Sequence, residues 1–228
     1  PKTIKKNFIL VFIIHNDQQM NSLKIGISMR IVKDNDYHEE RDALSHDWST
    51  FSELTNMTLI HISNSKNVKS FLEQMDLDGV ILSGGDNIGD TPKRDKTELE
   101  IINYCINKKL PIFGVCRGMQ LLNSFFQGNI TTINNNSHVK KSHTIKIVNE
   151  KLKLSNNKYS VNSFHKNLIH EKSLGKSLKI FAISDFDNSI EGFFHEFLPI
   201  IGVMWHPERE PNEFNQILVS NFFKTRLE

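Results

Sequence analysis

The sequence predicts a doubly wound α/β fold, in which a mostly parallel sheet is flanked by helices and carries a small antiparallel addition. Two observations predict it. From Leu23 onward, short apolar runs alternate with amphipathic segments, which is the pattern of βαβ units. From about residue 143 to 205, runs of Val, Ile and Phe follow one another, which indicates antiparallel strands. A functional site is then expected at the carboxyl ends of the parallel strands.

The parallel half begins with the apolar strand 23–28. A helix is expected from about Ser45, because Trp48, Phe51 and Leu54 recur at helical spacing. The same reasoning predicts a helix capped near Ser65, with apolar residues at positions 68, 71, 72 and 75. The remaining elements are apolar strands and amphipathic helices, in chain order strand 58–62, strand 80–82, helix 96–109, strand 112–115 and a helix directly after it.

The antiparallel addition is expected to contain the runs 144–148, 178–183 and 190–194. A further apolar run, 199–205, precedes His206 and brings that residue to the end of a strand. The Asn-rich tracts 134–136 and 156–157 predict turns between these strands.

The bulk properties fit one domain with a core of its own. The chain has 228 residues and a net charge of +2, and no basic run alternates with aromatic residues, so a nucleic-acid partner is not expected. Two cysteines make no disulfide framework, which predicts a reducing, cytoplasmic location. Cys105 has helical spacing to Ile102 and Ile106 and is interpreted as core filler. The sequence leaves the oligomeric state open, including a homodimer.

Residues 1–22 are interpreted as an N-terminal extension, and residues 23–228 as the domain. The extension has a basic start and an apolar run at 8–14. This run is too short to span a bilayer and no small-residue cleavage site follows it, so neither a membrane anchor nor a signal peptide is expected. The extension is expected to be partly disordered.

Cys116 is the leading candidate for a nucleophile. It follows the strand 112–115 directly, has glycines two residues before and after it (Gly114 and Gly118), and begins a helical pattern. This is the arrangement of a nucleophile elbow, with a thiol in place of the usual hydroxyl. A sulfur at a helix N-terminus is favoured as thiolate by the helix dipole. The alternative is a buried structural cysteine.

His206 and Glu208 supply the other groups that a cysteine nucleophile needs, a base and a carboxylate that orients it. They stand two residues apart at a strand end, so both side chains can point the same way. On its own this tripeptide fits an ordinary surface turn, but together with an elbow cysteine it indicates a catalytic site.

The motifs Gly114-Val-Cys116-Arg-Gly-Met-Gln120 and Trp205-His-Pro-Glu208 resemble those of class I glutamine amidotransferases, a flavodoxin-like fold. Arg117 after the nucleophile is similar to the γ-glutamyl hydrolase branch, the peptidase C26 group. Further matches lie at 81–86, 94–100 and 161–165, in the family's order. The resemblance implies a γ-glutamyl thioester on Cys116, hydrolysis of a C–N bond and release of glutamate, with His206 and Glu208 completing the triad and no cofactor.

Oxyanion stabilisation requires fixed backbone donors near the nucleophile. The Arg117 N–H follows Cys116 directly, and the loop 83–86 can approach closely because it is glycine-rich. The family pattern assigns the second donor to Gly85, whereas an ordinary glycine loop is the alternative. The resemblance also implies that Gln120 and the segment Ser163, Phe164 and His165 hold the glutamyl part. This chain departs from the family in having Lys166-Asn167 after that segment.

The sequence indicates the reaction at the γ-glutamyl carbon more clearly than it indicates the leaving group of the substrate. Residues 37–42 and 47–48 are similar to a capsule-synthesis member of the branch, which implies γ-glutamyl-CDP-amidate as substrate and cytidine diphosphoramidate as product. Lys93, Arg94, Lys96 and Lys166 could then face the diphosphate, although a solvated loop is the alternative for each lysine and is expected for at least two of them. The alternatives are a γ-glutamyl-amine hydrolase, for example for γ-glutamyl-γ-aminobutyrate, a glutaminase that supplies ammonia to a separate synthetase, and a non-enzymatic protein, which retention of the triad disfavours.

No metal site is expected. Of the ten histidines, His138 and His143 are five residues apart, but the sequence around them offers no evident third ligand. They are interpreted as surface or packing residues.

Overall fold

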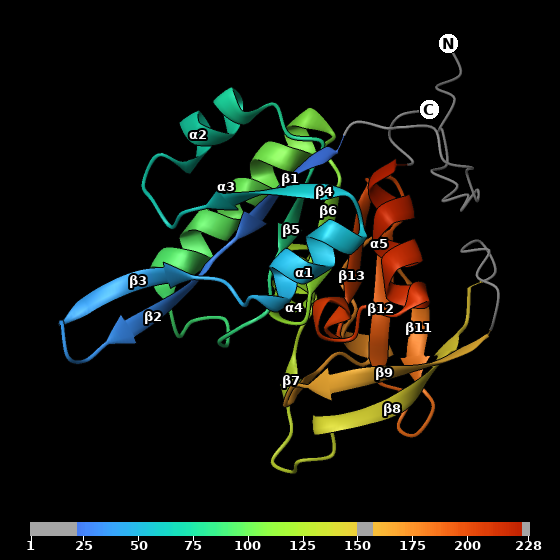
Figure 1. Cartoon of the computed structure of the whole chain (residues 1–228). Helices are drawn as coiled ribbons and strands as arrows, with labels where there is room; N and C mark the ends of the chain where they lie inside the picture. The colour runs from blue at the N-terminus through green and yellow to red at the C-terminus, as the bar shows by residue number, and fades with distance from the viewer. Residues whose placement is uncertain (1–21, 150–156, 225–228) are drawn as a thin grey trace.

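A nine-stranded mixed sheet forms the centre of the computed structural model, which describes residues 22–149 and 157–224 (Figure 1). The first five strands in space are parallel and the remaining four pair antiparallel, which confirms the predicted fold class. In spatial order the strands are β4 (Met57–Ile62), β1 (Leu23–Ser28), β5 (Gly79–Leu82), β6 (Ile112–Val115), β13 (Ile200–Val203), β12 (Ile190–His195), β11 (Leu178–Ser184), β8 (Val139–Ile147) and β9 (Lys158–Phe164). The predicted extension 1–22 lies almost wholly outside the described residues.

Helices cover both faces of the parallel half, because alternate strand residues point to opposite sides of the sheet. In β5, Ile81 packs in one core cluster with α1 (Asp47–Leu54) and α5 (Glu213–Lys224). Its neighbours Val80 and Leu82 pack in a second cluster with α2 (Val68–Met75), α3 (Pro92–Lys108) and α4 (Arg117–Phe125). The parallel strands are therefore apolar on both sides, as their sequences predicted.

The structure differs from the prediction at α3 and at the small sheets. Helix α3 begins at Pro92 rather than near Lys96, because a proline in the first helical turn needs no N–H partner. A hairpin of β2 (Arg30–Asp34) and β3 (Glu39–Ala43) projects from the domain (Figure 1). The sequence of β3 is charged rather than alternating, so its pattern gave no strand signal. Two short strands, β7 (Thr131–Thr132) and β10 (Asn167–Leu168), form another pair.

Three adjacent parallel strands end at one edge of the sheet. There β5 leads into Ser83-Gly84-Gly85, β6 into Cys116, and β13 through two residues into His206, which is followed by the short 3-10 helix η3 (Pro207–Arg209). The predicted placement of these groups at the carboxyl ends of the strands is confirmed.

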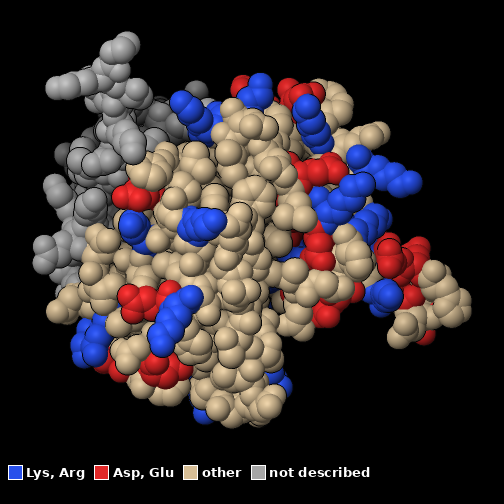
Figure 2. Space-filling view, turned by 180° about the vertical axis from the view of Figure 1, so that it is seen from behind, with Lys and Arg blue, Asp and Glu red and all other residues tan. Residues whose placement is uncertain are grey.

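The surface seen from behind carries Lys and Arg interspersed with Asp and Glu (Figure 2). Among residues 22–149 and 157–224, no helix is both long and apolar enough to cross a membrane.

Candidate active site at the carboxyl ends of three strands

Cys116 occupies the sharp turn between β6 and α4. Its backbone has φ +49° and ψ −102°, a conformation that is costly for a residue with a side chain. Its N–H donates to the Val203 carbonyl at 2.8 Å, which fixes the turn to the adjacent strand β13. The flanking glycines are required by space, since a Cβ on Gly118 would lie 2.2 Å from the Leu82 carbonyl oxygen and one on Gly114 would lie 2.8 Å from the Gly118 backbone. The predicted elbow geometry is confirmed.

His206 and Glu208 are brought together by the turn that begins η3. The His206 Nδ1–H donates to Glu208 Oε1 at 2.7 Å, and both side chains are buried. Asn162 of β9 holds the backbone of His206 from the other side, because it accepts from the His206 N–H at 2.9 Å and donates to its carbonyl at 2.8 Å. This clamp was missed from the sequence, where Asn162 was only part of a family motif.

The environment of His206 favours its protonated form. Burial by itself would lower the pKa of His206, but the negative charge and hydrogen bond of Cys116, together with the hydrogen bond and charge of Glu208, outweigh burial and raise it to about 9. The contacts of His206 with Cys116 and Glu208 thus favour an imidazolium near neutral pH, and Glu208 orients the ring.

The glycine loop after β5 lies directly against His206. A Cβ on Gly84 would lie 2.6 Å from His206 Cε1, so this position has no room for a side chain. Gly85 has φ +143°, and a Cβ there would lie 2.4 Å from Arg94 Nη1. Arg94 Nη2 donates to the carbonyls of Ser83 at 2.9 Å and Gly84 at 3.0 Å, which fixes the backbone of the loop.

A buried charge network links this loop to the elbow. Glu98 of α3 accepts from Arg94 Nε at 3.0 Å and from Arg117 Nη1, and Arg117 also pairs with Asp95. Arg94, Glu98 and Arg117 are all essentially inaccessible to solvent. The expectation that Arg94 faces a diphosphate is therefore wrong, because its side chain is fully buried and its Nε and Nη2 are already paired inside the protein. Lys93, Lys96 and Lys166 are exposed.

Gln120 lies one helical turn after Cys116 and is buried. Its Oε1 accepts from Asn167 Nδ2 at 3.0 Å, and its Nε2 donates to Met204 Sδ at 3.6 Å. Asn167 also donates to Asn87 Oδ1 at 3.1 Å. The asparagine at the position where this chain departs from the family pattern thus orients the predicted glutamyl-binding glutamine.

The predicted glutamyl-binding segment divides between two places. Phe164 packs edge-on against the His206 ring, with centroids 5.8 Å apart, and the Arg209 guanidinium lies 4.3 Å from the Phe164 ring centroid. Ser163 and His165 point instead into the interior, where the Ser163 hydroxyl donates to the His138 carbonyl at 2.7 Å. Burial lowers the pKa of His165 to about 4, despite the nearby Glu191, so this imidazole is neutral at pH 7.

The two histidines interpreted as packing residues meet a buried carboxylate in the antiparallel half of the sheet. His138 and His143 approach Glu191 of β12, a third potential ligand that the sequence interpretation did not find because it stands 48 residues after His143. The sequence signal for it was an acidic residue within the otherwise apolar run 190–194.

Comparison with known proteins identifies the family. The family model for class I glutamine amidotransferases matches residues 37–225. The γ-glutamyl-CDP-amidate hydrolase of Campylobacter jejuni is 33% identical over 207 residues, which cover 86% of this chain and 94% of that protein. The anthranilate synthase component 2 of Saccharolobus solfataricus is 30% identical over 154 residues, covering 66% of this chain and 77% of that protein.

Among solved structures, a glutamine amidotransferase from Thermotoga maritima superimposes with a TM-score of 0.67 at 13% identity, covering 92% of this chain and 100% of that one. This likeness supports the fold. The family match over most of the chain and the similarity of the curated relatives together lead to one conclusion: the chain belongs to the class I glutamine amidotransferase family and is a glutamine amidotransferase-like hydrolase.

Proposed function

We propose that the protein hydrolyses a γ-glutamyl C–N bond through a thioester on Cys116 and releases glutamate. The observation that carries this proposal is the strained Cys116 at the N-terminus of α4, paired with a buried His206 that Glu208 orients. A thiolate held beside an imidazolium is the activated form of a cysteine nucleophile.

The chemistry then runs in two steps. The Cys116 thiolate attacks the γ-carbonyl carbon, and as the tetrahedral intermediate collapses, the His206 imidazolium gives its proton to the leaving nitrogen. The C–N bond breaks and a thioester remains. Neutral His206 next takes a proton from water, whose oxygen attacks the thioester carbon, and the C–S bond breaks to release glutamate and restore the thiolate.

The oxyanion of both intermediates would be bound by the backbone N–H groups of Arg117 and Gly85. Supporting this, Arg117 is the first residue of α4, where N–H groups lack helical partners, and Gly85 lies in the loop that touches His206 through Gly84. The glutamyl part would be held by Gln120 and by the segment 163–165. Because the Ser163 and His165 side chains point inward, we expect this segment to contribute its backbone and the exposed Phe164.

We further propose γ-glutamyl-CDP-amidate as the substrate. Its hydrolysis, by the chemistry of the peptidase C26 group, would release cytidine diphosphoramidate for capsule modification. Support comes from the relative in Campylobacter jejuni and from cations beside the site. Arg209 is exposed above Phe164, and the Arg30 Cβ lies 3.6 Å from where a Cβ of Gly85 would be. With Arg94 committed to the interior, these two arginines replace it as candidate contacts for a diphosphate.

The experiment compares kcat/KM for γ-glutamyl-CDP-amidate, glutamine and γ-glutamyl-γ-aminobutyrate under identical conditions. A preference of about a hundredfold for the nucleotide substrate is expected if two charge-assisted contacts hold the diphosphate. In Arg209→Gln this preference should fall about tenfold, whereas Lys179→Gln, an exposed cation on β11, serves as the matched control and should not change it.

Two results would redirect the proposal. Equal or faster turnover of the simple amides would indicate a γ-glutamyl-amine hydrolase. Glutamine turnover that rises sharply when a cell fraction is added would indicate a glutaminase that works with a separate synthetase. The thioester at Cys116 belongs to all three activities.

A further inference from the structure

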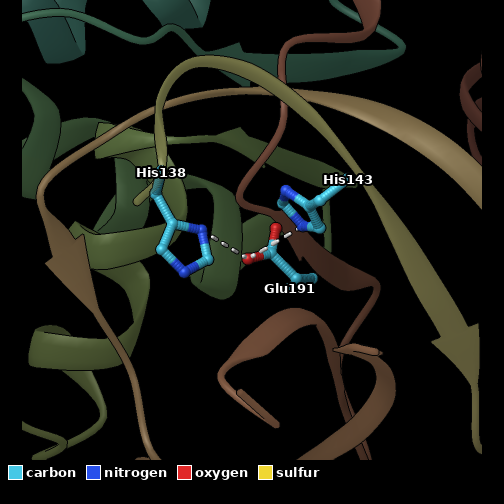
Figure 3. Close-up of side chains that lie close together, drawn as sticks. All are labelled: His138, His143 and Glu191. Atoms are coloured by element: carbon cyan, nitrogen blue, oxygen red, sulfur yellow. Dashed lines mark ion pairs between the residues drawn. The ribbon is translucent and has the colours of Figure 1, made fainter. Parts of the chain in front are cut away.

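A second cluster of functional side chains lies in the antiparallel half of the sheet. His138 precedes β8, His143 lies within β8, and Glu191 lies on β12, and their side chains converge (Figure 3). His138 Nδ1 lies 3.8 Å and His143 Nε2 3.5 Å from the same oxygen, Glu191 Oε1. From the corner after β9, His165 Nε2 approaches that oxygen at 3.7 Å. Three imidazole nitrogens thus surround one carboxylate oxygen.

The outer nitrogens of two of these rings are already committed. His138 Nε2–H donates to Asp187 Oδ2 at 2.8 Å, and His165 Nδ1–H donates to the Asn167 carbonyl at 2.9 Å. In a neutral imidazole the other nitrogen then carries a lone pair and no proton. The inner nitrogens of both rings face Glu191, where their lone pairs can bind a cation, and His138 Nδ1 also lies 3.4 Å from the Ser163 hydroxyl oxygen. A carboxylate or carbonyl on the outer nitrogen is also the usual partner of a metal-binding histidine.

Glu191 lacks the hydrogen bonds that a buried carboxylate requires. Its side chain is fully buried, and within the described residues neither of its carboxylate oxygens accepts a hydrogen bond. The Nε2 atoms of His143 and His165 are likewise buried and unpartnered in this part of the chain. An uncompensated buried carboxylate is strongly unfavourable. Three imidazole nitrogens that converge on a buried carboxylate without hydrogen bonds form a set of ligand atoms for a cation.

We propose that His138, His143 and Glu191 bind a Zn²⁺ ion, with His165 as the fourth ligand. Zinc prefers four nitrogen, sulfur or oxygen ligands in a tetrahedron, and bonds of about 2.0–2.1 Å place ligand atoms about 3.3 Å apart. One ligand atom from each of His138, His143 and Glu191 lies within 4.8 Å of the other two, so these three can share one ion after a contraction. His165 Nε2 lies 3.7 Å from Glu191 Oε1 but outside this set, and would move inward to become the fourth ligand. Imidazole ligands with one carboxylate suit zinc better than Ca²⁺ or Mg²⁺.

The site is closed, which indicates a structural role. His138 and Glu191 are inaccessible to solvent, and His143 retains only 12% side-chain exposure, with its Nε2 buried. The ion would join β8, β12 and the corner after β9. That corner follows Asn162, whose side chain clamps the backbone of His206. Zinc would thus hold in place the strand that positions the catalytic histidine, without touching the reacting atoms.

The test measures zinc directly and does not depend on turnover. Full-length protein without an affinity tag is stripped with a chelator, dialysed and titrated with Zn²⁺, while metal content and melting temperature are followed. One ion per chain and a rise in Tm on the order of 5 °C are expected. Co²⁺ in place of zinc should give the visible absorption of a tetrahedral site. In His143→Ala, zinc affinity should fall at least about a hundredfold, whereas His170→Ala, an exposed histidine, should retain wild-type affinity.

Asp187→Asn provides a variant that leaves every ligand in place. Loss of the carboxylate that orients His138 should weaken zinc binding about 10–100-fold, an effect that a purely structural hydrogen bond would not have on metal affinity. Absence of saturable zinc binding in the wild-type protein would overturn the proposal. So would zinc binding that is equally strong in His143→Ala and Asp187→Asn, because the ion would then lie elsewhere.

Discussion

At the scale of single residues, the reactivity of the site depends on the proton held by His206. Burial by itself lowers the pKa of His206, whereas the adjacent Cys116 and Glu208 raise it. Because the pKa of His206 is raised to about 9, the imidazolium that would protonate the leaving nitrogen in the proposed mechanism persists through neutral pH and is lost as the pH rises through that value.

Glu208→Gln should therefore move the alkaline limb of the pH profile. In the wild-type protein kcat/KM is expected to fall as pH rises through about 9. The amide keeps a hydrogen-bonding group but removes the negative charge that raises the pKa of His206, so the limb should shift to lower pH, with a smaller loss of rate than in His206→Ala. Profiles of kcat/KM across the neutral and alkaline range measure the shift. An unchanged limb in the variant would mean that Glu208 does not set this pKa.

At the scale of elements, the loop after β5 and the turn after β13 are fitted to each other. Gly84 contacts the His206 ring so closely that a methyl group cannot be added without moving one of them. The ring is held by Glu208 and its backbone by Asn162, so little freedom remains to absorb such a change. The position of the His206 ring therefore depends on the absence of a side chain at residue 84.

Gly84→Ala is expected to lower kcat about a hundredfold, because a misplacement of about 1 Å in a catalytic group can cost that much. The control is Gly89→Ala in the same connection, where no atom lies within 4 Å of an added Cβ, although its φ of +96° will cost some stability. Circular dichroism and melting curves should show that both variants fold. Wild-type turnover by Gly84→Ala would show that the loop and His206 are not in contact in solution.

At the scale of the whole molecule, α3 connects the glycine loop after β5 with the turn between β6 and α4 that contains Cys116. Glu98 accepts from Ser28 Oγ at 2.8 Å at the end of β1, from Arg94 behind the glycine loop, and from Arg117 in the elbow. Three strand ends are thus tied to one buried carboxylate. When that carboxylate is removed, Arg94 loses its ion-pair partner and Arg117 retains only Asp95.

Glu98→Gln should destabilise the fold by about 3–5 kcal/mol, the usual cost of removing one member of a buried ion cluster. Equilibrium unfolding in urea measures the change, with Glu100→Gln, a half-buried residue on the same helix, as the control. A loss below about 1 kcal/mol in Glu98→Gln, no more than an exposed ion pair contributes, would mean that the network is dispensable for stability.

The sequence predicted those features whose signals are local. The βαβ rhythm indicated the sheet, and Cys116 between two glycines, with His206 and Glu208 two residues apart, indicated the candidate triad because each motif is a continuous stretch of chain. The charge network could not be predicted in this way. Arg94 was expected to face a diphosphate. Its i,i+4 spacing to Glu98 is visible in the sequence, but only the packing of α3 against the strand ends shows that both side chains are buried and that Arg117 joins them. Glu191 likewise meets His143 only through pairing of the antiparallel strands.

The central claim is that Cys116 carries the glutamyl group, and trapping that intermediate tests it most directly. Wild-type protein is mixed with γ-glutamyl-CDP-amidate or glutamine, quenched in acid during turnover and analysed by intact-protein and peptide mass spectrometry. One glutamyl adduct is expected, located on Cys116 and absent from the buried Cys105. Cys116→Ala should form no adduct and lose several orders of magnitude in rate. An adduct on another residue, or full turnover by Cys116→Ala, would contradict the mechanism.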